Sequence, residues 1–213
     1  RLEGILSMII IKKQRQTFRV LILTYLAACF FLFLYSFTQI DLNLTLSRLT
    51  ILQSIQKSFQ YVGYYQRPLS TLLYLGVLGL LFISYWGILR FLSKHPMPMR
   101  QFFVYVLVLV GILVLSYPAF SYDMFNYMFT AKTVVLYHKN PYAVIPLDFS
   151  GVDPWLSFMR WTHLPSAYTP LWILLTLPAY LFGFGSVLLT LWNIKVIVAI
   201  SFLVTTWLIG KIL

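Results

Sequence analysis

Long runs of apolar residues without a charge dominate the pattern of hydrophobic and polar positions along the chain. The first three runs cover residues 20–38, 69–89 and 101–122, and each matches the roughly 20 residues that a helix needs to cross about 30 Å of hydrocarbon. A fourth run, residues 166–194, is too long for one crossing, and a turn with two glycines divides it. The pattern therefore predicts an all-α, polytopic membrane protein with about five transmembrane helices, the fifth near residues 187–209.

Two segments outside these runs are expected to be ordered. In residues 42–62, apolar side chains recur at steps of three or four with polar ones between them, which predicts an amphipathic helix along the outer membrane interface. A spacer that seeks the interface and an element that grips lipid or substrate fit this pattern equally well. In the loop 121–165, Asp153 followed by Pro154 is typical of a helix start, so a short helix over about 153–162 is expected.

Composition supports the membrane assignment. The chain is 60% hydrophobic and 10% charged, with a mean hydropathy of +0.83, far from the balance of a soluble domain. Its net charge of +11 is dispersed over loops that flank the apolar runs, which gives no reason to expect nucleic acid as a partner. The single cysteine, Cys29, cannot form an internal disulfide. Because the chain starts with Arg1 and stops inside or just after an apolar helix, we expect a fragment of a longer protein.

The distribution of basic residues predicts the orientation in the membrane. Eight Lys and Arg residues lie in the N-terminal segment 1–19 and in the loop after the second run, against six in the intervening loops. This modest bias favours a cytoplasmic N-terminus. Residues 20–122 would then hold three transmembrane helices, the loop 121–166 would be extracytoplasmic, and residues 167–213 would hold two more helices.

Candidate chemistry gathers at the start of the extracytoplasmic loop. Four polar residues share one face of a helix that begins near residue 122: Asp123, Asn126, Tyr127 and Thr130. A carboxylate in such company can accept a proton from a sugar hydroxyl, or help to hold a metal. An equally good interpretation is that Asp123 only caps the helix and pairs with Lys132 or Arg160.

Cations follow on the same side of the membrane. His138, Lys139, Lys132, Arg160 and His163 would offer positive charge to a departing lipid phosphate, although each one alone is more often a solvated or headgroup-facing residue. Lys195 lies about nine residues into the fifth run. A lysine at that depth either snorkels to the interface or serves a functional site, such as one for the phosphate of a lipid carrier.

Other site types have no support in the sequence. His and Cys do not cluster at metal-ligand spacing, and no glycine-rich phosphate loop follows a strand. A soluble nucleotide-sugar enzyme is therefore excluded, and a sugar donor has to be reachable from the membrane. No cofactor is indicated with certainty, and a divalent metal is left open.

Three short motifs resemble a known group of enzymes. They are SYDMFNYMFTAK at 121–132, which contains Asp123, NPY at 140–142 and YTPLW at 168–172. Together they resemble the GT-C class of integral-membrane glycosyltransferases, and within it the mannosyltransferase branch with glycosylphosphatidylinositol mannosyltransferase I and bacterial relatives. The resemblance covers about residues 117–172. Two departures are that Phe125 stands where the branch often has a second acid, and that the spacing between NPY and YTPLW is longer.

The resemblance implies an activity and roles for individual residues. It implies transfer of a sugar, with mannose as the first candidate, from a polyprenyl-phosphate-linked donor to a glycan or lipid acceptor, with Asp123 as the general base and inversion at the sugar. Membrane lipids are further partners, and the fragment alone is expected to be inactive. The residues expected to bind substrate are Asn126, Tyr127, His138, Lys139, Asn140, Tyr142, Arg160, His163, Tyr168 and Lys195.

Rival functions remain open at this point. A transporter or flippase of lipid-linked sugars would carry polar groups inside several spans and repeats between halves, whereas the first three runs hold no charged residue. A non-catalytic subunit would use the outer loop for docking and would not need Asp123. A polysaccharide polymerase or ligase would share the topology but use a lipid-linked glycan donor.

Overall fold

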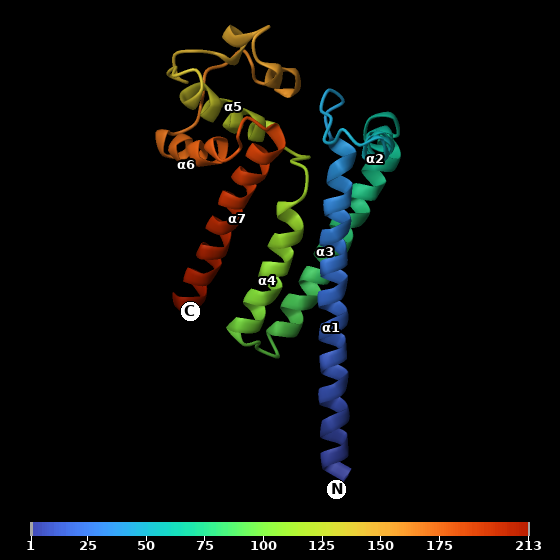
Figure 1. The fold of residues 1–213 in the computed structure, drawn as a ribbon. Helices are drawn as coiled ribbons and strands as arrows, with labels where there is room; N and C mark the ends of the chain where they lie inside the picture. The colour runs from blue at the N-terminus through green and yellow to red at the C-terminus, as the bar shows by residue number, and fades with distance from the viewer. Residues whose placement is uncertain (1, 213) are drawn as a thin grey trace. The chain divides into compact units, whose positions relative to one another are not determined.

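A computed structural model describes residues 2–212 of the chain, and the side chains of residues 2–11 and 15 lie outside that description. All regular elements in the described part are helices (Figure 1). The chain forms two compact units: unit 1 consists of Arg1–Tyr35 and Gln66–Ser116, and unit 2 of Ser36–Tyr65 and Tyr117–Leu213. The expected all-α fold is confirmed, and each unit is described below by itself.

Unit 1 is built from three apolar helices, α1 (Leu2–Ser36), α3 (Arg67–Leu92) and α4 (Met99–Val114). Close contact between α1 and α3 depends on Gly87, where an added Cβ would lie 2.8 Å from Leu21. Near the other end of α3, the Tyr35 hydroxyl is hydrogen-bonded to Ser70 at 3.0 Å. Small and hydroxyl-bearing residues thus let two long helices approach, as is usual where lipid replaces water.

Unit 2 consists of several short helices followed, in chain order, by one long apolar helix. Its elements are η1 (Phe37–Gln39), α2 (Thr50–Gln60), η2 (Tyr61–Tyr65), α5 (Asp123–Val135), η3 (Pro146–Phe149), η4 (Pro154–Phe158), α6 (Pro170–Leu181) and α7 (Val187–Ile212). Helix α5 packs on α6, and α6 packs on α7. Phe125, Met128 and Phe129 of α5 are almost fully buried, and they form the centre of the unit's hydrophobic core.

A buried ion pair joins α5 to the loop that follows it. The Lys132 ammonium lies 2.6 Å from Asp153, and both side chains are nearly inaccessible. The remaining capacity of Asp153 is used as well, because its carboxylate accepts the Tyr137 hydroxyl at 2.8 Å and the Trp155 amide at 2.9 Å. The Lys132 ammonium also lies over the Trp155 ring, 4.2 Å from its centroid. A buried pair with all partners satisfied resists separation of the groups it joins.

The predicted spans agree with the helices in part. Residues 12–39, 67–92 and 187–212 form helices long and apolar enough to cross a membrane, and they include the first, second and fifth predicted spans. Helix α4 has 16 residues and α6 has 12, which gives lengths of about 24 Å and about 18 Å. The prediction of five crossings is therefore not confirmed.

The local sequence explains why α6 is short. Pro170 lies at its start, Thr169 caps it by accepting the Trp172 amide, and Pro178 lies inside it. The predicted glycine break is confirmed, because Gly185 has a φ of +75° and a Cβ on Gly183 would overlap Thr190. In Figure 1, α6 runs across the start of α7 rather than alongside it.

Two predicted loop helices are shorter than expected. Only Thr50–Gln60 of the segment 42–62 is α-helical, followed by the π-helical turn Tyr61–Tyr65. The preceding backbone is not helical, and the Gln56 amide binds it by donating to the Leu44 carbonyl at 2.6 Å and accepting from the Leu46 amide at 3.0 Å. The helix predicted from Asp153 is confirmed at its start but ends at Phe158 as a five-residue 3-10 helix.

Replacing Lys132 with methionine should destabilise the protein, because the fully buried Asp153 would lose its counter-ion. We expect a loss of about 3 kcal/mol, the usual result of breaking one side of a buried pair. Thermal unfolding of the detergent-purified protein measures it. Lys139→Met, at an exposed position seven residues on, is the control, and equal unfolding temperatures for the two variants would contradict the role assigned to the pair.

Candidate active site

Asp123 is the first residue of α5. Its backbone amide donates to the Ser121 hydroxyl at 3.2 Å, and the N-cap residue is Tyr122, so the Asp123 side chain does not cap the helix. The start of α5 therefore fixes the position of the Asp123 carboxylate.

One face of α5 borders a cavity of about 290 Å³. Asp123, Asn126, Thr130 and Thr133 supply that face, which matches a helical repeat of three to four residues. Phe129 of α5 also lines the cavity. The rest of the wall comes from the segment after α5: Pro141, Val144, Pro146, Met159, Trp161, Leu164, Pro165, Ser166, Ala167 and Tyr168. The volume lies near the lower end of the roughly 300–1,000 Å³ typical of small-molecule sites.

Tyr168 reaches across the cavity to Asp123. Its hydroxyl donates to Asp123 Oδ1 at the long distance of 3.5 Å. Burial raises the pKa of Tyr168 to about 12; a hydrogen bond from Asn126 opposes this rise, and the Asp123 charge adds to it. The phenol therefore stays protonated at neutral pH and remains a donor beside the carboxylate.

Asn126 leaves a polar atom unused at the cavity. Its side-chain Oδ1 is buried and has no hydrogen-bond partner among the described residues. A buried acceptor without a donor costs free energy. A bound molecule with a hydroxyl group would supply the missing donor, as a sugar does.

Two further predicted residues support Tyr168 without lining the cavity. The Tyr127 ring meets the rings of Tyr168 and Trp172 edge-on, with centroids 4.5 Å and 5.1 Å away. The Tyr142 hydroxyl donates to the Tyr168 carbonyl at 2.5 Å. The motifs at 121–132, 140–142 and 168–172, far apart in sequence, thus meet at one place.

Asp123 is not neutralised by either cation considered as its partner. The ion pairs found among residues 2–212 join Lys132 to Asp153 and Arg160 to Asp41. The interpretation of Asp123 as a helix cap paired with Lys132 or Arg160 is therefore wrong.

A comparison with protein families decides the class of the chain. Residues 27–213 match the family model described as "Alpha-(1->6)-mannopyranosyltransferase, N-terminal domain". The chain belongs to this mannosyltransferase family. No curated protein and no solved structure matches the chain. The resemblance to membrane mannosyltransferases is confirmed, and with it the general class of glycosyltransferase.

Three of the predicted cations do not line the cavity, although each lies close in sequence to a residue that does. His138, Lys139 and His163 are exposed, and none of them lines the cavity. Each lies within three residues of a lining residue, Pro141 or Leu164. Asn140 is also exposed, and its side chain accepts the Tyr142 amide at 3.0 Å.

Two predicted cations lie elsewhere in unit 2. Arg160 stacks on Tyr122, 4.6 Å from the ring centroid, and lies 4.0 Å from Asp41. A hydrogen bond with Tyr122 raises the pKa of Arg160 further. Lys195 is half-buried on α7 and does not line the cavity. The structure therefore brings Asp123, Asn126 and Tyr168 together and leaves these two outside.

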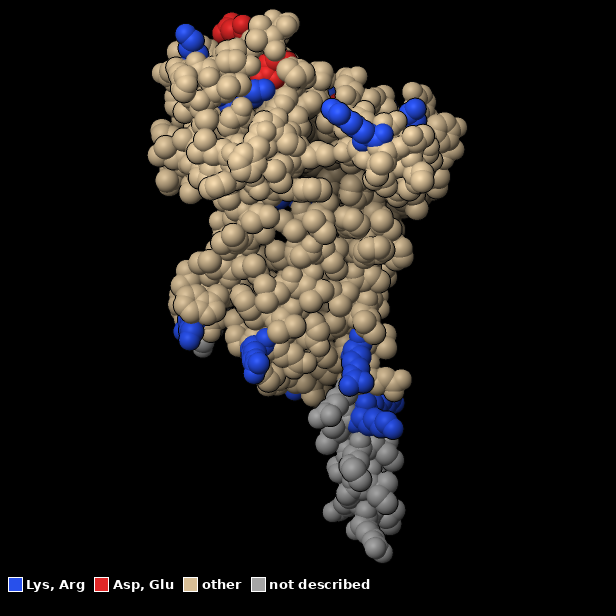
Figure 2. All heavy atoms as spheres, in the orientation of Figure 1, with Lys and Arg blue, Asp and Glu red and all other residues tan. Residues whose placement is uncertain are grey.

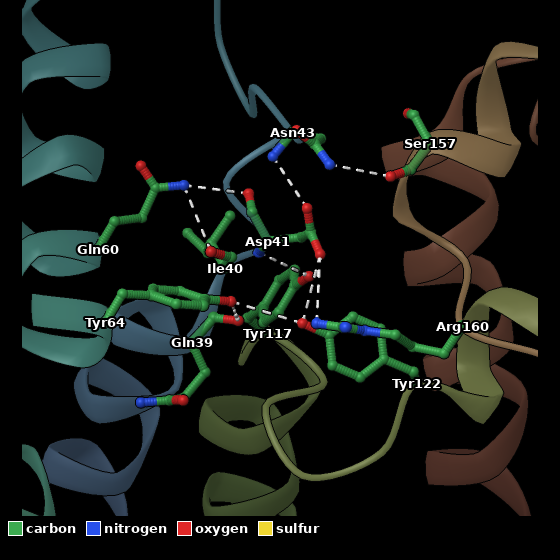
Figure 3. Close-up of polar contacts among 10 residues, drawn as sticks. All are labelled: Gln39, Ile40, Asp41, Asn43, Gln60, Tyr64, Tyr117, Tyr122, Ser157 and Arg160. Atoms are coloured by element: carbon green, nitrogen blue, oxygen red, sulfur yellow. Dashed lines mark hydrogen bonds and ion pairs between the residues drawn. The ribbon is translucent and has the colours of Figure 1, made fainter. Parts of the chain in front are cut away.

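A second carboxylate, Asp41, was missed in the sequence (Figure 3). It is 7% exposed, and its carboxylate accepts the Asn43 amide at 2.9 Å and the Tyr122 hydroxyl at 3.5 Å. Burial raises the pKa of Tyr117 and of Tyr64, two phenols of the same cluster. The signal was available, because Asp41 lies three residues after the end of an apolar run, much as Asp123 follows another.

The two carboxylates differ in how many hydrogen-bond donors and cations contact each of them. Asp41 is held by donors from its own turn, from Tyr122 and from Arg160, whereas Asp123 has one long hydrogen bond and borders a cavity. No group of three or more His, Cys, Asp or Glu that could hold a metal was found in the described part of the chain.

Proposed function

We propose that this protein transfers a sugar, with mannose favoured by its family, from a polyprenyl-phosphate-linked donor to an acceptor on the extracytoplasmic face. Asp123 is the general base. The observation that carries this proposal is that the Asp123 carboxylate faces a sugar-sized cavity and has only one long hydrogen bond. A general base needs such access to the proton that it removes.

The charge of the cavity favours the acceptor, rather than the donor phosphate, as its ligand. Its lining holds one carboxylate and no Lys, Arg or His, so an anionic phosphate would be repelled from it. A neutral sugar fits better, because Asn126 Oδ1 offers an acceptor for a hydroxyl and Trp161 offers an aromatic face. The donor phosphate then lies outside, where His138, Lys139 and His163 supply positive charge.

The transfer proceeds by one displacement. An acceptor hydroxyl gives its proton to Asp123 while its oxygen attacks the anomeric carbon of the donor sugar. The bond from that carbon to the phosphate oxygen breaks with inversion, and polyprenyl phosphate leaves with the bonding electrons. Tyr168 donates to the Asp123 carboxylate and fixes its direction, and the surrounding cations stabilise the phosphate as it departs.

Exchange of Asp123 for asparagine removes the proton acceptor but keeps the shape of the side chain. In membranes that contain the full-length protein, we expect turnover to fall about 100- to 10,000-fold, the usual contribution of a general base. Tyr168→Phe should lower it about 3- to 10-fold, the loss of one hydrogen bond. Sugar transfer from polyprenyl-phosphomannose, at matched expression, measures both.

Asp41→Asn is the matched control for that experiment, because it makes the same chemical change in the second carboxylate. We expect it to keep most of the activity, since asparagine still accepts hydrogen bonds. An active Asp123→Asn beside an inactive Asp41→Asn would move the general base to Asp41. Equal activity of all variants with the wild type would favour a transporter or a non-catalytic subunit.

The proposed orientation has its own test. We infer a cytoplasmic N-terminus from the bias of basic residues, so His163 should be external and Lys94 internal; both are exposed. Single cysteines at these positions, in a Cys29→Ala background, are treated with a membrane-impermeant maleimide. We expect the cysteine at 163 to react in intact cells and the one at 94 only after permeabilisation. The reverse pattern would contradict the orientation.

A further inference from the structure

Unit 1 contains a cleft that the proposed transfer does not use. It lies where the turn between α3 and α4 meets α1, and its volume is about 560 Å³. The residues that line it are Gln14, Phe18, Arg19, Phe91, Leu92, His95, Pro96, Met97, Pro98, Gln101 and Tyr105. None of them belongs to unit 2.

The floor of the cleft is a stack of aromatic rings from three different segments. Phe91 lies between Phe18 and His95, with ring centroids 5.0 Å and 4.6 Å away, and Tyr105 meets Phe18 edge-on at 6.2 Å. The His95 ring nitrogen Nδ1 is bonded to the Phe91 carbonyl at 3.3 Å. The cleft therefore has a fixed, largely apolar floor with a polar edge.

Positive charge surrounds the cleft. Arg19 and His95 line it, and the neighbouring turns of the same segments add Lys12, Lys13, Arg90, Lys94 and Arg100. Figure 2 shows Lys and Arg side chains gathered at the end of unit 1 where α3 leads into α4. The only acid in the sequence of unit 1 is Glu3, and the ion pairs found among the described residues both lie in unit 2.

The cleft also lies at a membrane boundary. The candidate spans Lys12–Gln39 and Arg67–Leu92 begin and end beside it, so the apolar surfaces of both spans extend away from the cleft. A ligand with a negative headgroup and acyl chains fits both the basic cleft and the apolar helix surfaces beside it. Basic pockets between membrane helices bind such lipids.

We propose that this cleft binds the headgroup of an anionic phospholipid. The phosphate lies against Arg19 and the edge of His95, the glycerol lies on the Phe18–Phe91 stack, and the acyl chains follow the apolar surfaces of α1 and α3. The site holds a membrane lipid rather than the sugar donor, and it does not depend on the transfer reaction.

Binding of fluorescent phosphatidylglycerol to the detergent-purified full chain tests the site, with fluorescent phosphatidylcholine as the neutral probe. We expect phosphatidylglycerol to bind more tightly. Arg19→Gln should weaken that binding about 5-fold and Arg19→Gln with Lys94→Gln about 20- to 30-fold, since one cation near a lipid surface contributes about 1 kcal/mol. Arg67→Gln, at the opposite end of α3, should change nothing.

Three outcomes would overturn the proposal. Equal binding of both lipids would exclude recognition of the charge, and equal losses in Arg19→Gln and Arg67→Gln would exclude the cleft. Displacement of the lipid by millimolar inorganic phosphate would indicate a site for a soluble anion instead. Unchanged thermal unfolding of each variant confirms that lost binding is not lost folding.

Discussion

The buried Lys132–Asp153 pair is the interaction on which the geometry of the site depends. Asp153 starts η4, and the chain that follows supplies Met159, Trp161 and Tyr168 to the cavity wall. Lys132 lies on α5, the helix whose neighbouring face carries Asn126 and Thr130. One ion pair, 2.6 Å long and shielded from water, therefore holds the loop half of the cavity against its helical half. Apolar contacts act in the same direction, because Trp155, Phe158 and Met159 of the loop are buried in the core that contains Phe125.

Sequence periodicity was sufficient to predict the helical half of the site. Asp123, Asn126, Tyr127 and Thr130 were expected on one face because a helix repeats every 3.6 residues, and all of them except Tyr127 line one cavity. The same reasoning identified the long apolar helices. It overestimated α6, because the threonine cap and the proline at its start begin the helix only at Pro170, inside an apolar run. The hydrophobicity of a segment alone does not predict the residue at which a helix begins.

The features missed in the sequence depend on contacts between distant segments. Asp41 meets Tyr122 and Arg160, residues 81 and more positions away, and no local pattern connects them. Residues 44–46 were predicted as helix because their pattern fits one, yet they are not helical and the Gln56 side chain binds their backbone groups. The roles of the cations could not be predicted either, since Lys132 is buried beside Asp153, a partner 21 residues away, whereas Lys139 is exposed.

The central claim is that the cavity beside Asp123 holds the sugar that accepts the transferred residue. Photo-crosslinking with a diazirine-bearing α-mannoside tests it most directly, with the labelled peptides identified by mass spectrometry in the full-length protein. We expect adducts on Pro141, Trp161 and residues 164–168, and we expect an unlabelled mannoside to abolish these adducts by competition. Adducts confined to the cluster of Asp41, Asn43 and Tyr64 would contradict it and place the acceptor at the second carboxylate.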